Sequence, residues 1–162
     1  MDICLIWTHA RNRAANQDDS TSWLGAEDLR RFHSLTDRHP VLMGRRTWEM
    51  IPRALLTGRQ SFVLTKETAS IPGAVACNSI HEAFTLASVL RSGKLFLLGG
   101  AALHEQGLRV ADRLYLAHME PGADDLQFPP IDPRLFELVR QDRTGSIGPA
   151  RLFQEYRRRK FH

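Results

Sequence analysis

The sequence predicts an α/β fold, in which helices flank a mixed and mostly parallel sheet. Short apolar runs of strand length alternate with segments of helical period along most of the chain, as in repeated strand and helix units. The last two apolar runs are instead joined through Gly145 and Gly148, which predicts a closing antiparallel pair. The length of 162 residues suits a single domain with one core, spanning residues 1–162.

The strands are predicted from apolar runs that are bounded by turn residues or charges. The run at residues 3–7 is apolar on both faces, which indicates a central buried strand. The run at residues 94–98 is the strongest of the chain and leads directly into Gly99 and Gly100. In chain order, strands are expected at residues 3–7, 41–43, 61–65, 73–78, 94–98, 114–119, 136–139 and 152–156.

Segments of helical period lie between these strands. In the first of them, Phe32 and Leu35 share an apolar stripe, with Leu29 at its margin. Residues 9–22, which precede this helix, are polar and irregular and therefore predict a long loop, either a functional lid or a plain surface segment. Helices are expected at residues 26–36, 44–51, 80–90 and 101–108.

Asp28 is the unusual residue of the first helix, because it projects between Phe32 and Leu35 in the apolar stripe. A carboxylate left unpaired in such a position costs about 2 to 7 kcal/mol. Asp28 is therefore either a helix-end acid favoured by the helix dipole or a group that faces a ligand pocket. The pocket is favoured, because Glu27 already serves the helix end, and burial there would raise the pKa of the Asp28 carboxyl.

The stretch at residues 41–51 predicts an anion-binding corner. A strand is broken by a glycine, and Arg45, Arg46 and Thr47 follow where backbone N–H groups lack helical partners. Lys66 follows the next strand at its carboxyl end, where open α/β sheets bind their ligands. No acidic residue is expected at the matching strand ends, so the corner suits a phosphate. A turn followed by a solvated helix end explains the arginines equally well.

A second weak signal for phosphate is the pair Gly99 and Gly100 between a strand and a helix. Glycines let a backbone approach a pyrophosphate closely, while the N–H groups of the helix start point toward it. The spacing is not the dinucleotide fingerprint, and a tight turn between strand and helix is an equally good explanation.

Composition narrows the class of protein without identifying it. The net charge of +4 owes much to the basic residues 157–160, which are expected to form a tail. It fits either an acidic small ligand or weak nonspecific attraction to nucleic acid. A nucleic-acid module is disfavoured, because the arginines are not interleaved with stacking aromatic residues. Cys4 and Cys77 lack metal-ligand spacing and are expected to be reduced core thiols. Without a leader or a membrane-length apolar run, a cytoplasmic location is expected.

Taken in order, several segments together resemble the dihydrofolate reductase family over nearly the whole chain. The central GRRTWE is fairly specific, and the ordered combination is far more specific than any single segment. The resemblance implies a three-layer fold with a central, mostly parallel eight-stranded sheet, a C-terminal antiparallel hairpin and about four flanking helices. The resembling segments are residues 23–32, 39–51, 56–65, 95–106, 111–119 and 125–131.

The function implied by the resemblance is the reduction of 7,8-dihydrofolate to 5,6,7,8-tetrahydrofolate, with NADPH as hydride donor, for one-carbon metabolism and thymidylate synthesis. Such a protein would be a cytoplasmic monomer that binds a small molecule and neither nucleic acid nor membrane. Three positive charges at the corner favour NADPH over NADH. A reductase of another pterin or of a pyrimidine intermediate, and a non-catalytic NADPH-binding relative, remain as alternatives.

The resemblance also implies roles for individual residues. Asp28 corresponds to the only ionisable group of the pterin pocket and Arg59 to the guanidinium that binds the α-carboxylate of the glutamate tail. The carbonyls of Ile6 and Leu98 would line that pocket. The implied substrate-binding residues are Ile6, Leu29, Phe32, Ile51, Leu55, Arg59 and Leu98. The implied cofactor-binding residues are Thr8, Arg45, Arg46, Thr47, Thr65, Lys66, Gly99, Gly100, Ala101, Ala102 and Gln106, and no metal ligand is implied.

Several positions depart from the family pattern. Residues 15–19 replace an apolar segment that closes over the nicotinamide, so turnover is expected to be modest. Trp7 stands where the family has a small residue, while Ala117 and Leu126 each replace a threonine. These changes predict an altered pocket and the tolerance of antifolates such as trimethoprim.

Overall fold

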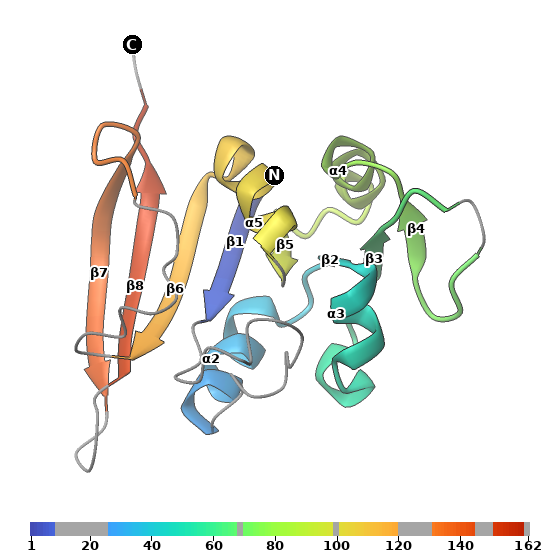
Figure 1. Cartoon of the computed structure of the whole chain (residues 1–162), viewed down its shortest axis with the longest axis horizontal. Helices are drawn as coiled ribbons and strands as arrows, with labels where there is room; N and C mark the ends of the chain where they lie inside the picture. The colour runs from blue at the N-terminus through green and yellow to red at the C-terminus, as the bar shows by residue number, and fades with distance from the viewer. Residues whose placement is uncertain (9–25, 68–69, 99–100, 120–130, 145–150, 161–162) are drawn as a thin grey trace.

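The computed structural model describes residues 1–8, 26–67, 70–98, 101–119, 131–144 and 151–160 (Figure 1). Its strands are β1 (Asp2–Thr8), β2 (Val41–Gly44), β3 (Ser61–Leu64), β4 (Val75–Cys77), β5 (Lys94–Leu98), β6 (Arg113–Met119), β7 (Phe136–Thr144) and β8 (Arg151–Arg158). They form one eight-stranded sheet in the order β4-β3-β2-β5-β1-β6-β8-β7. Neighbouring strands from β4 to β6 are parallel, whereas β8 is antiparallel to both β6 and β7. The predicted mixed sheet with a closing hairpin is confirmed.

The described helices occupy the connections between the parallel strands. They are α2 (Ala26–Thr36), α3 (Arg45–Met50), α4 (Ile80–Ser88) and α5 (Ala101–Val110), with a short 3₁₀ helix, η1 (Arg53–Leu56). The predicted helix at 26–36 and the predicted strand at 94–98 have the observed boundaries. The α4 helix is capped at its start, since the N-cap Ser79 Oγ accepts from the Glu82 N–H, while Glu82 Oε2 accepts from the N–H of the preceding residue, Asn78.

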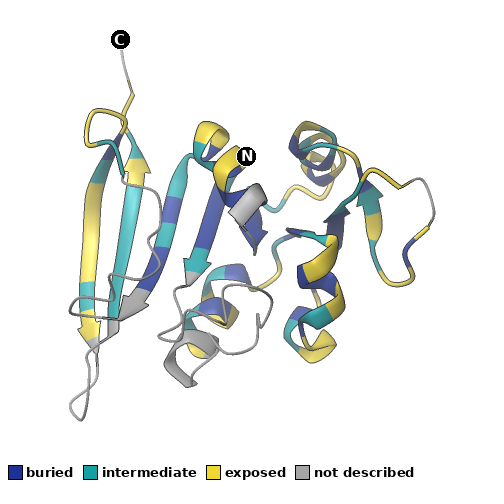
Figure 2. Cartoon of the chain, viewed as in Figure 1, coloured by how far each residue is buried: buried dark blue, intermediate teal, exposed yellow. Residues whose placement is uncertain are grey.

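Two apolar cores lie on opposite faces of the sheet, which makes the fold three-layered. Side chains alternate between the faces, so Leu5 of β1 packs with α4 and α5, while Cys4 and Ile6 pack with Phe32 of α2 and Trp48 of α3. Figure 2 shows buried residues concentrated in the central strands, in contrast to the exposed outer strand β7. The sheet therefore presents one of its faces to α2 and α3, where the candidate site lies.

Both cysteines lie in these cores, as predicted, and neither forms a disulfide. Burial raises the pKa of the Cys4 thiol to about 12 and that of the Cys77 thiol to about 11. Both side chains therefore stay protonated at neutral pH and act as small apolar residues.

The prediction that residues 157–160 form a basic tail is wrong for the arginines at the end of β8. Arg158 donates from Nε to the Ala111 carbonyl (2.6 Å) and from Nη2 to the Leu108 carbonyl (2.8 Å), at the C-terminus of α5. Its guanidinium carbon also lies 4.5 Å from the centre of the Phe136 ring. A cation at a helix C-terminus satisfies carbonyls that lack helical partners, so Arg158 holds α5 to the hairpin.

Replacing Arg158 with Ala is expected to lower the free energy of unfolding by about 1 to 2 kcal/mol, because two charge-assisted hydrogen bonds and a ring contact are lost. Lys160→Ala removes the same charge from an exposed residue two positions further on and is expected to change stability by less than about 0.5 kcal/mol. Urea unfolding of both variants measures the difference. Equal losses would show that the net charge of this segment matters rather than the contacts of Arg158.

Candidate active site

The α2 and α3 face of the sheet brings together most of the apolar residues predicted to bind the substrate. Ile6, Phe32, Ile51 and Leu98 are buried in one cluster, and the partly buried Leu55 packs against it. These residues come from β1, α2, the end of α3, β5 and η1, so only the fold makes them neighbours. Their role in binding a substrate stays a prediction.

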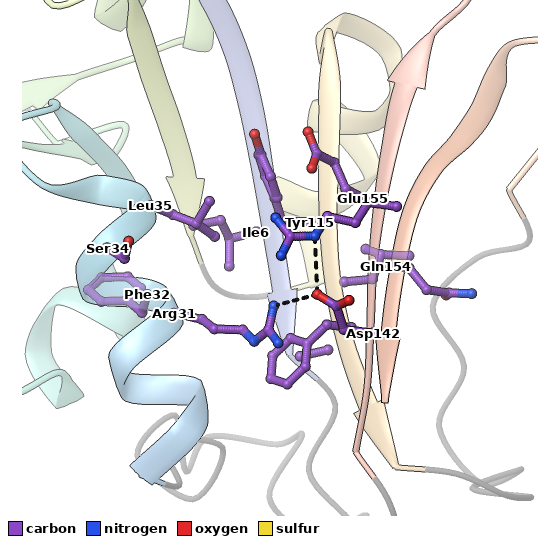
Figure 3. A pocket seen from close by; sticks show the side chains of 13 residues that line it. Ile6, Arg31, Phe32, Ser34, Leu35, Tyr115, Asp142, Gln154 and Glu155 are labelled. Carbon is purple, nitrogen blue, oxygen red and sulfur yellow. Dashed lines mark hydrogen bonds and ion pairs between the residues drawn. The ribbon is translucent and has the colours of Figure 1, made fainter. Parts of the chain in front are cut away.

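A cavity of about 240 Å³ lies between α2 and the β1, β6, β8 and β7 part of the sheet (Figure 3). Two predicted substrate residues, Ile6 and Phe32, line it, as do Leu35 of the apolar stripe and Ala117 of β6. The Ala117 methyl offers no hydrogen bond at a position where the family pattern has a hydroxyl. The remaining lining residues are Arg31, Ser34, Tyr115, Leu116, Arg140, Asp142, Phe153, Gln154 and Glu155.

The hairpin side of this cavity is polar and is bonded to α2. Arg31 Nη1 lies 3.3 Å from Asp142 Oδ2, and the Arg31 guanidinium stacks 3.8 Å from the centre of the Phe153 ring. Arg140 Nε lies 3.1 Å from the same Asp142 oxygen. Figure 3 shows Arg31 and Asp142 approaching each other from opposite walls. Sequence reasoning missed these hairpin residues, because Arg31 and Asp142 are 111 positions apart and no local pattern links them.

The inner wall of the cavity carries a tyrosine that stays neutral. Burial and the nearby Glu155 carboxylate raise the pKa of Tyr115 well above its ordinary value. Glu155 is itself paired with Arg113, whose Nη1 lies 2.9 Å from Glu155 Oε1. Tyr115 therefore contributes a hydroxyl and not a charge to this cavity.

Arg59 is bonded to the last turn of α2. Its Nε donates to Thr36 Oγ1 (2.8 Å), its Nη2 donates to the His33 carbonyl (3.0 Å), and its Nη1 donates to the Thr57 carbonyl (2.8 Å). The residue is 8% exposed, and no carboxylate of the described residues forms an ion pair with it. Burial accordingly lowers the pKa of the Arg59 guanidinium, only partly offset by Asp37. A buried cation with no carboxylate partner among the described residues suits an anionic ligand.

The α2 helix fixes the axial spacing between the backbone of Asp28 and the residues to which Arg59 is bonded. Asp28 lies in its first turn, and Arg59 is bonded to Thr36 at its last residue. Eight residues at 1.5 Å each separate these positions by about 12 Å along the helix axis.

The predicted phosphate corner is assembled at the carboxyl ends of β2 and β3. Gly44 pairs with Leu64 in the parallel register, so Arg45 and Thr65 follow at the same edge of the sheet. Arg46 and Lys66 are exposed there, whereas Thr47 is buried. Three cationic side chains and a threonine hydroxyl at neighbouring strand ends form a donor set that fits a phosphorylated nucleotide.

The expectation that no acidic residue lies at this corner is wrong. Glu67 Oε2 lies 3.0 Å from Arg45 Nη1, and Glu49 Oε1 lies 3.2 Å from Arg45 Nε. The backbone N–H of Glu67 donates to Thr65 Oγ1 (3.1 Å), which turns the chain after β3 toward Arg45. The strand pattern ended before Glu67, so its approach to Arg45, 22 residues away, was not visible in the sequence.

A buried histidine that sequence reasoning also missed lies behind the substrate face. His104 of α5 is 6% exposed, its Nε2 lies 3.3 Å from the Ile6 carbonyl oxygen, and its ring meets Trp7 edge-on at 6.0 Å. Burial lowers the pKa of His104 to about 3, so the ring is neutral and Nε2–H donates to Ile6. The Ile6 carbonyl, which was predicted to line the pterin pocket, therefore accepts a hydrogen bond from a residue of α5.

Because the folded-state pKa of His104 lies below the ordinary value of 6.5, the unfolded chain binds a proton more readily than the folded one. Its contribution to stability is therefore complete above pH 6.5 and is lost progressively as the pH falls toward 3. Between pH 7.5 and 5.5 the free energy of unfolding should fall by about 1.4 kcal/mol from this group alone. Urea unfolding of the wild type and of His104→Gln at both pH values measures this loss, which the variant should lack. An equal fall in both proteins would contradict the prediction.

Of the other residues predicted to form the site, Gln106 is exposed on α5. Gly99 and Gly100 lie outside the described residues, as do residues 9–25 and Leu126. The side chains of Thr8, Asp28, Leu29, Ala101 and Ala102 also lie outside the described part, although their backbones belong to β1, α2 and α5.

The fold and the site define an open-sheet α/β protein with a cavity beside α2 and cationic side chains at the ends of β2 and β3. The family model for dihydrofolate reductase matches residues 2–158. The chain is 32% identical over 140 residues to the dihydrofolate reductase of Mycobacterium leprae, covering 80% of this chain and 82% of that protein. It is 34% identical over 151 residues to dihydrofolate reductase HdrB of Haloferax volcanii, covering 87% and 78%. A further similar protein, the dihydrofolate reductase of Buchnera aphidicola subsp. Baizongia pistaciae, is 34% identical over 141 residues, covering 86% and 84%.

The chain belongs to the dihydrofolate reductase family. The resemblance stated from the sequence is confirmed, and so are the implied fold class and the prediction of an oxidoreductase. Within the described residues, no helix is long and apolar enough to cross a membrane.

Proposed function

We propose that this protein reduces 7,8-dihydrofolate to 5,6,7,8-tetrahydrofolate, with NADPH as hydride donor, and so supplies one-carbon metabolism and thymidylate synthesis. The observation that carries the proposal is the burial of the Arg59 guanidinium without a carboxylate partner among the described residues. Its partner Thr36 lies about 12 Å along the axis of α2 from Asp28. Dihydrofolate has a pterin ring at one end and the α-carboxylate of a glutamate tail at the other, which suits this pair.

In the proposed reaction the protein binds the substrate, excludes water from it and helps to place a proton. When bound, NADPH would provide the hydride for C6 of the pterin ring. Asp28 favours the substrate that is protonated at N5, directly or through a water molecule. Phe32, Ile51 and Leu98 form an apolar wall that keeps water from the reacting ring.

Arg45, Arg46, Thr47, Thr65 and Lys66 would hold the phosphates and the adenosine end of NADPH, and Gln106 would continue that edge. The glycine pair at 99–100, with Thr8, Ala101 and Ala102, would complete the cofactor site, while Leu29 and Leu55 would complete the apolar wall. In these roles the side chains provide charge, hydrogen bonds and shape.

The alternatives are less well supported by the site. A pterin or pyrimidine intermediate without a glutamate tail leaves the buried Arg59 without an anionic partner, which is unfavourable. A non-catalytic NADPH-binding relative has no need for an acid and a guanidinium at opposite ends of α2. Residues 1–162 are further proposed to form one monomeric, cytoplasmic domain.

Steady-state oxidation of NADPH with dihydrofolate, measured beside NADPH binding by fluorescence, tests the proposal. Turnover that requires dihydrofolate is expected. NADPH binding without turnover would identify a binding protein, and equal turnover of a dihydropterin without the glutamate tail would favour the other reductase. Adding trimethoprim to the same assay tests the proposed antifolate tolerance, which rests on Ala117 in the cavity wall and on Trp7, whose ring packs against His104 of α5 in the core on the opposite face of the sheet.

A further inference from the structure

The corner formed by β2 and β3 carries almost as many negative charges as positive ones. Glu67 and Glu49 both form ion pairs with Arg45, at 3.0 and 3.2 Å. Their two carboxylates offset two of the three cations that sequence reasoning counted, namely Arg45, Arg46 and Lys66. The corner is therefore less attractive to a dianion than its arginines alone indicate.

Glu67 and Glu49 differ in where they approach Arg45. Glu49 contacts Nε from one turn further along α3, away from the strand ends. Glu67 contacts the terminal Nη1 and is fixed beside Thr65 through its backbone N–H, at the carboxyl end of β3. Of the two acids, Glu67 thus lies at the sheet edge where the adenosine end of a dinucleotide is proposed to bind.

A carboxylate at this position has opposite effects on the two nicotinamide coenzymes. It repels the 2′-phosphate of NADPH, and it competes with that phosphate for Arg45. Toward NADH it is an acceptor for the free ribose hydroxyl, the task that acidic residues perform at the strand ends of other dinucleotide-binding sheets. The side chains of Arg45 and Glu67 are 43% and 69% exposed, so their ion pair is weak enough to open when a ligand binds.

We propose that Glu67 is a coenzyme-specificity residue, which lowers the preference of this site for a 2′-phosphorylated dinucleotide over a non-phosphorylated one. The inference rests on the proposed function, because it takes the corner to be the adenosine end of the NADPH site. Arg46 and Lys66 still favour the phosphate, so NADPH remains the better coenzyme but by a reduced margin.

Calorimetric titration of the full chain with 2′,5′-ADP and with 5′-AMP tests the proposal without any hydride transfer. The ratio of the two dissociation constants, 5′-AMP over 2′,5′-ADP, reports discrimination at the ribose 2′ position. In Glu67→Gln this ratio is expected to rise about three- to tenfold, the size expected of one surface charge acting on a dianion over several ångströms in water. The rise should shrink as ionic strength increases from about 0.05 to 0.5 M, because salt screens exposed charges.

Glu49→Gln is the matched control, because it also removes one carboxylate and one ion pair from Arg45. Its ratio is expected to change less than about twofold, since that carboxylate lies further from the strand ends. An unchanged ratio in Glu67→Gln, an equal rise in both variants, or no binding of either fragment to the wild type would each overturn the proposal. Thermal unfolding of each variant confirms that it is folded during the titration.

Two outcomes distinguish an error in the proposed function from an error in the role proposed for Glu67. Wild-type protein that oxidises NADPH with dihydrofolate, together with an unchanged fragment ratio in Glu67→Gln, refutes the role of Glu67 alone. A raised fragment ratio in a protein that does not reduce dihydrofolate supports the role of Glu67 and refutes the proposed reaction.

Discussion

Replacing Asp28 with Asn is expected to lower kcat/KM for dihydrofolate by about 10²- to 10⁴-fold at pH 7, the usual contribution of a positioned acid or base. The substitution keeps the shape of the side chain and removes its ionisable group. NADPH binding should be unchanged, because the cofactor corner lies at the ends of β2 and β3 and not on α2. Single-turnover oxidation of bound NADPH, measured beside its dissociation constant, separates the two effects.

Glu27→Gln is the control for Asp28, because it removes an acid from the adjacent position in the same turn of α2. It is expected to retain most of the activity. Near-normal reduction of dihydrofolate by Asp28→Asn at pH 7 would show that the catalytic assignment is wrong. The acid would then have to be sought in the segment at residues 9–25, beginning with Asp18 and Asp19.

Replacing Arg59 with Lys is expected to raise KM for dihydrofolate by about 10- to 100-fold, with a smaller change in kcat. Lysine keeps the charge but lacks the planar fork that bonds a carboxylate through two parallel N–H groups. Hydrogen bonds to charged groups contribute about 1.5 to 3 kcal/mol each, which corresponds to this range of KM. Steady-state kinetics with varied dihydrofolate at saturating NADPH measures the change.

A structural role of Arg59 must be separated from a binding role, because its guanidinium also holds the last turn of α2 through Thr36 and His33. A dihydropterin that lacks the glutamate tail provides the control substrate. Its KM should be nearly the same in the wild type and in Arg59→Lys, since it has no carboxylate to lose. If both substrates lose equally, Arg59 acts by positioning α2 and not by binding the tail.

Local patterns in the sequence were sufficient to predict the elements of the fold and their order. The boundaries of α2 and β5 agree with the prediction, because each has a clear period and is followed by turn residues. The open sheet also made it possible to predict that Arg45, Arg46 and Lys66 would gather at one edge. Parallel strands end on the same side, so residues that follow them become neighbours.

The family resemblance added the roles of Asp28 and Arg59, which no local pattern of charge or hydrophobicity would have assigned together. The structure supplies the physical basis for pairing them, since α2 carries one and is bonded to the other. The distance along the helix from Asp28 to Thr36, the partner of Arg59, follows from the rise per residue. The sequence alone did not reveal that Arg59 is buried and that no described carboxylate forms an ion pair with it.

Only the tertiary structure decided which distant residues meet at the site. Asp142 closes the cavity with Arg31 across 111 positions, His104 bonds the Ile6 carbonyl across 98, and Glu67 reaches Arg45 across 22. The sequence determined the strands, the helices and the residues at their ends, because those depend on neighbours within a few positions. Ion pairs and hydrogen bonds between separate elements depend instead on strand order, register and the path of each loop, which periodicity does not encode.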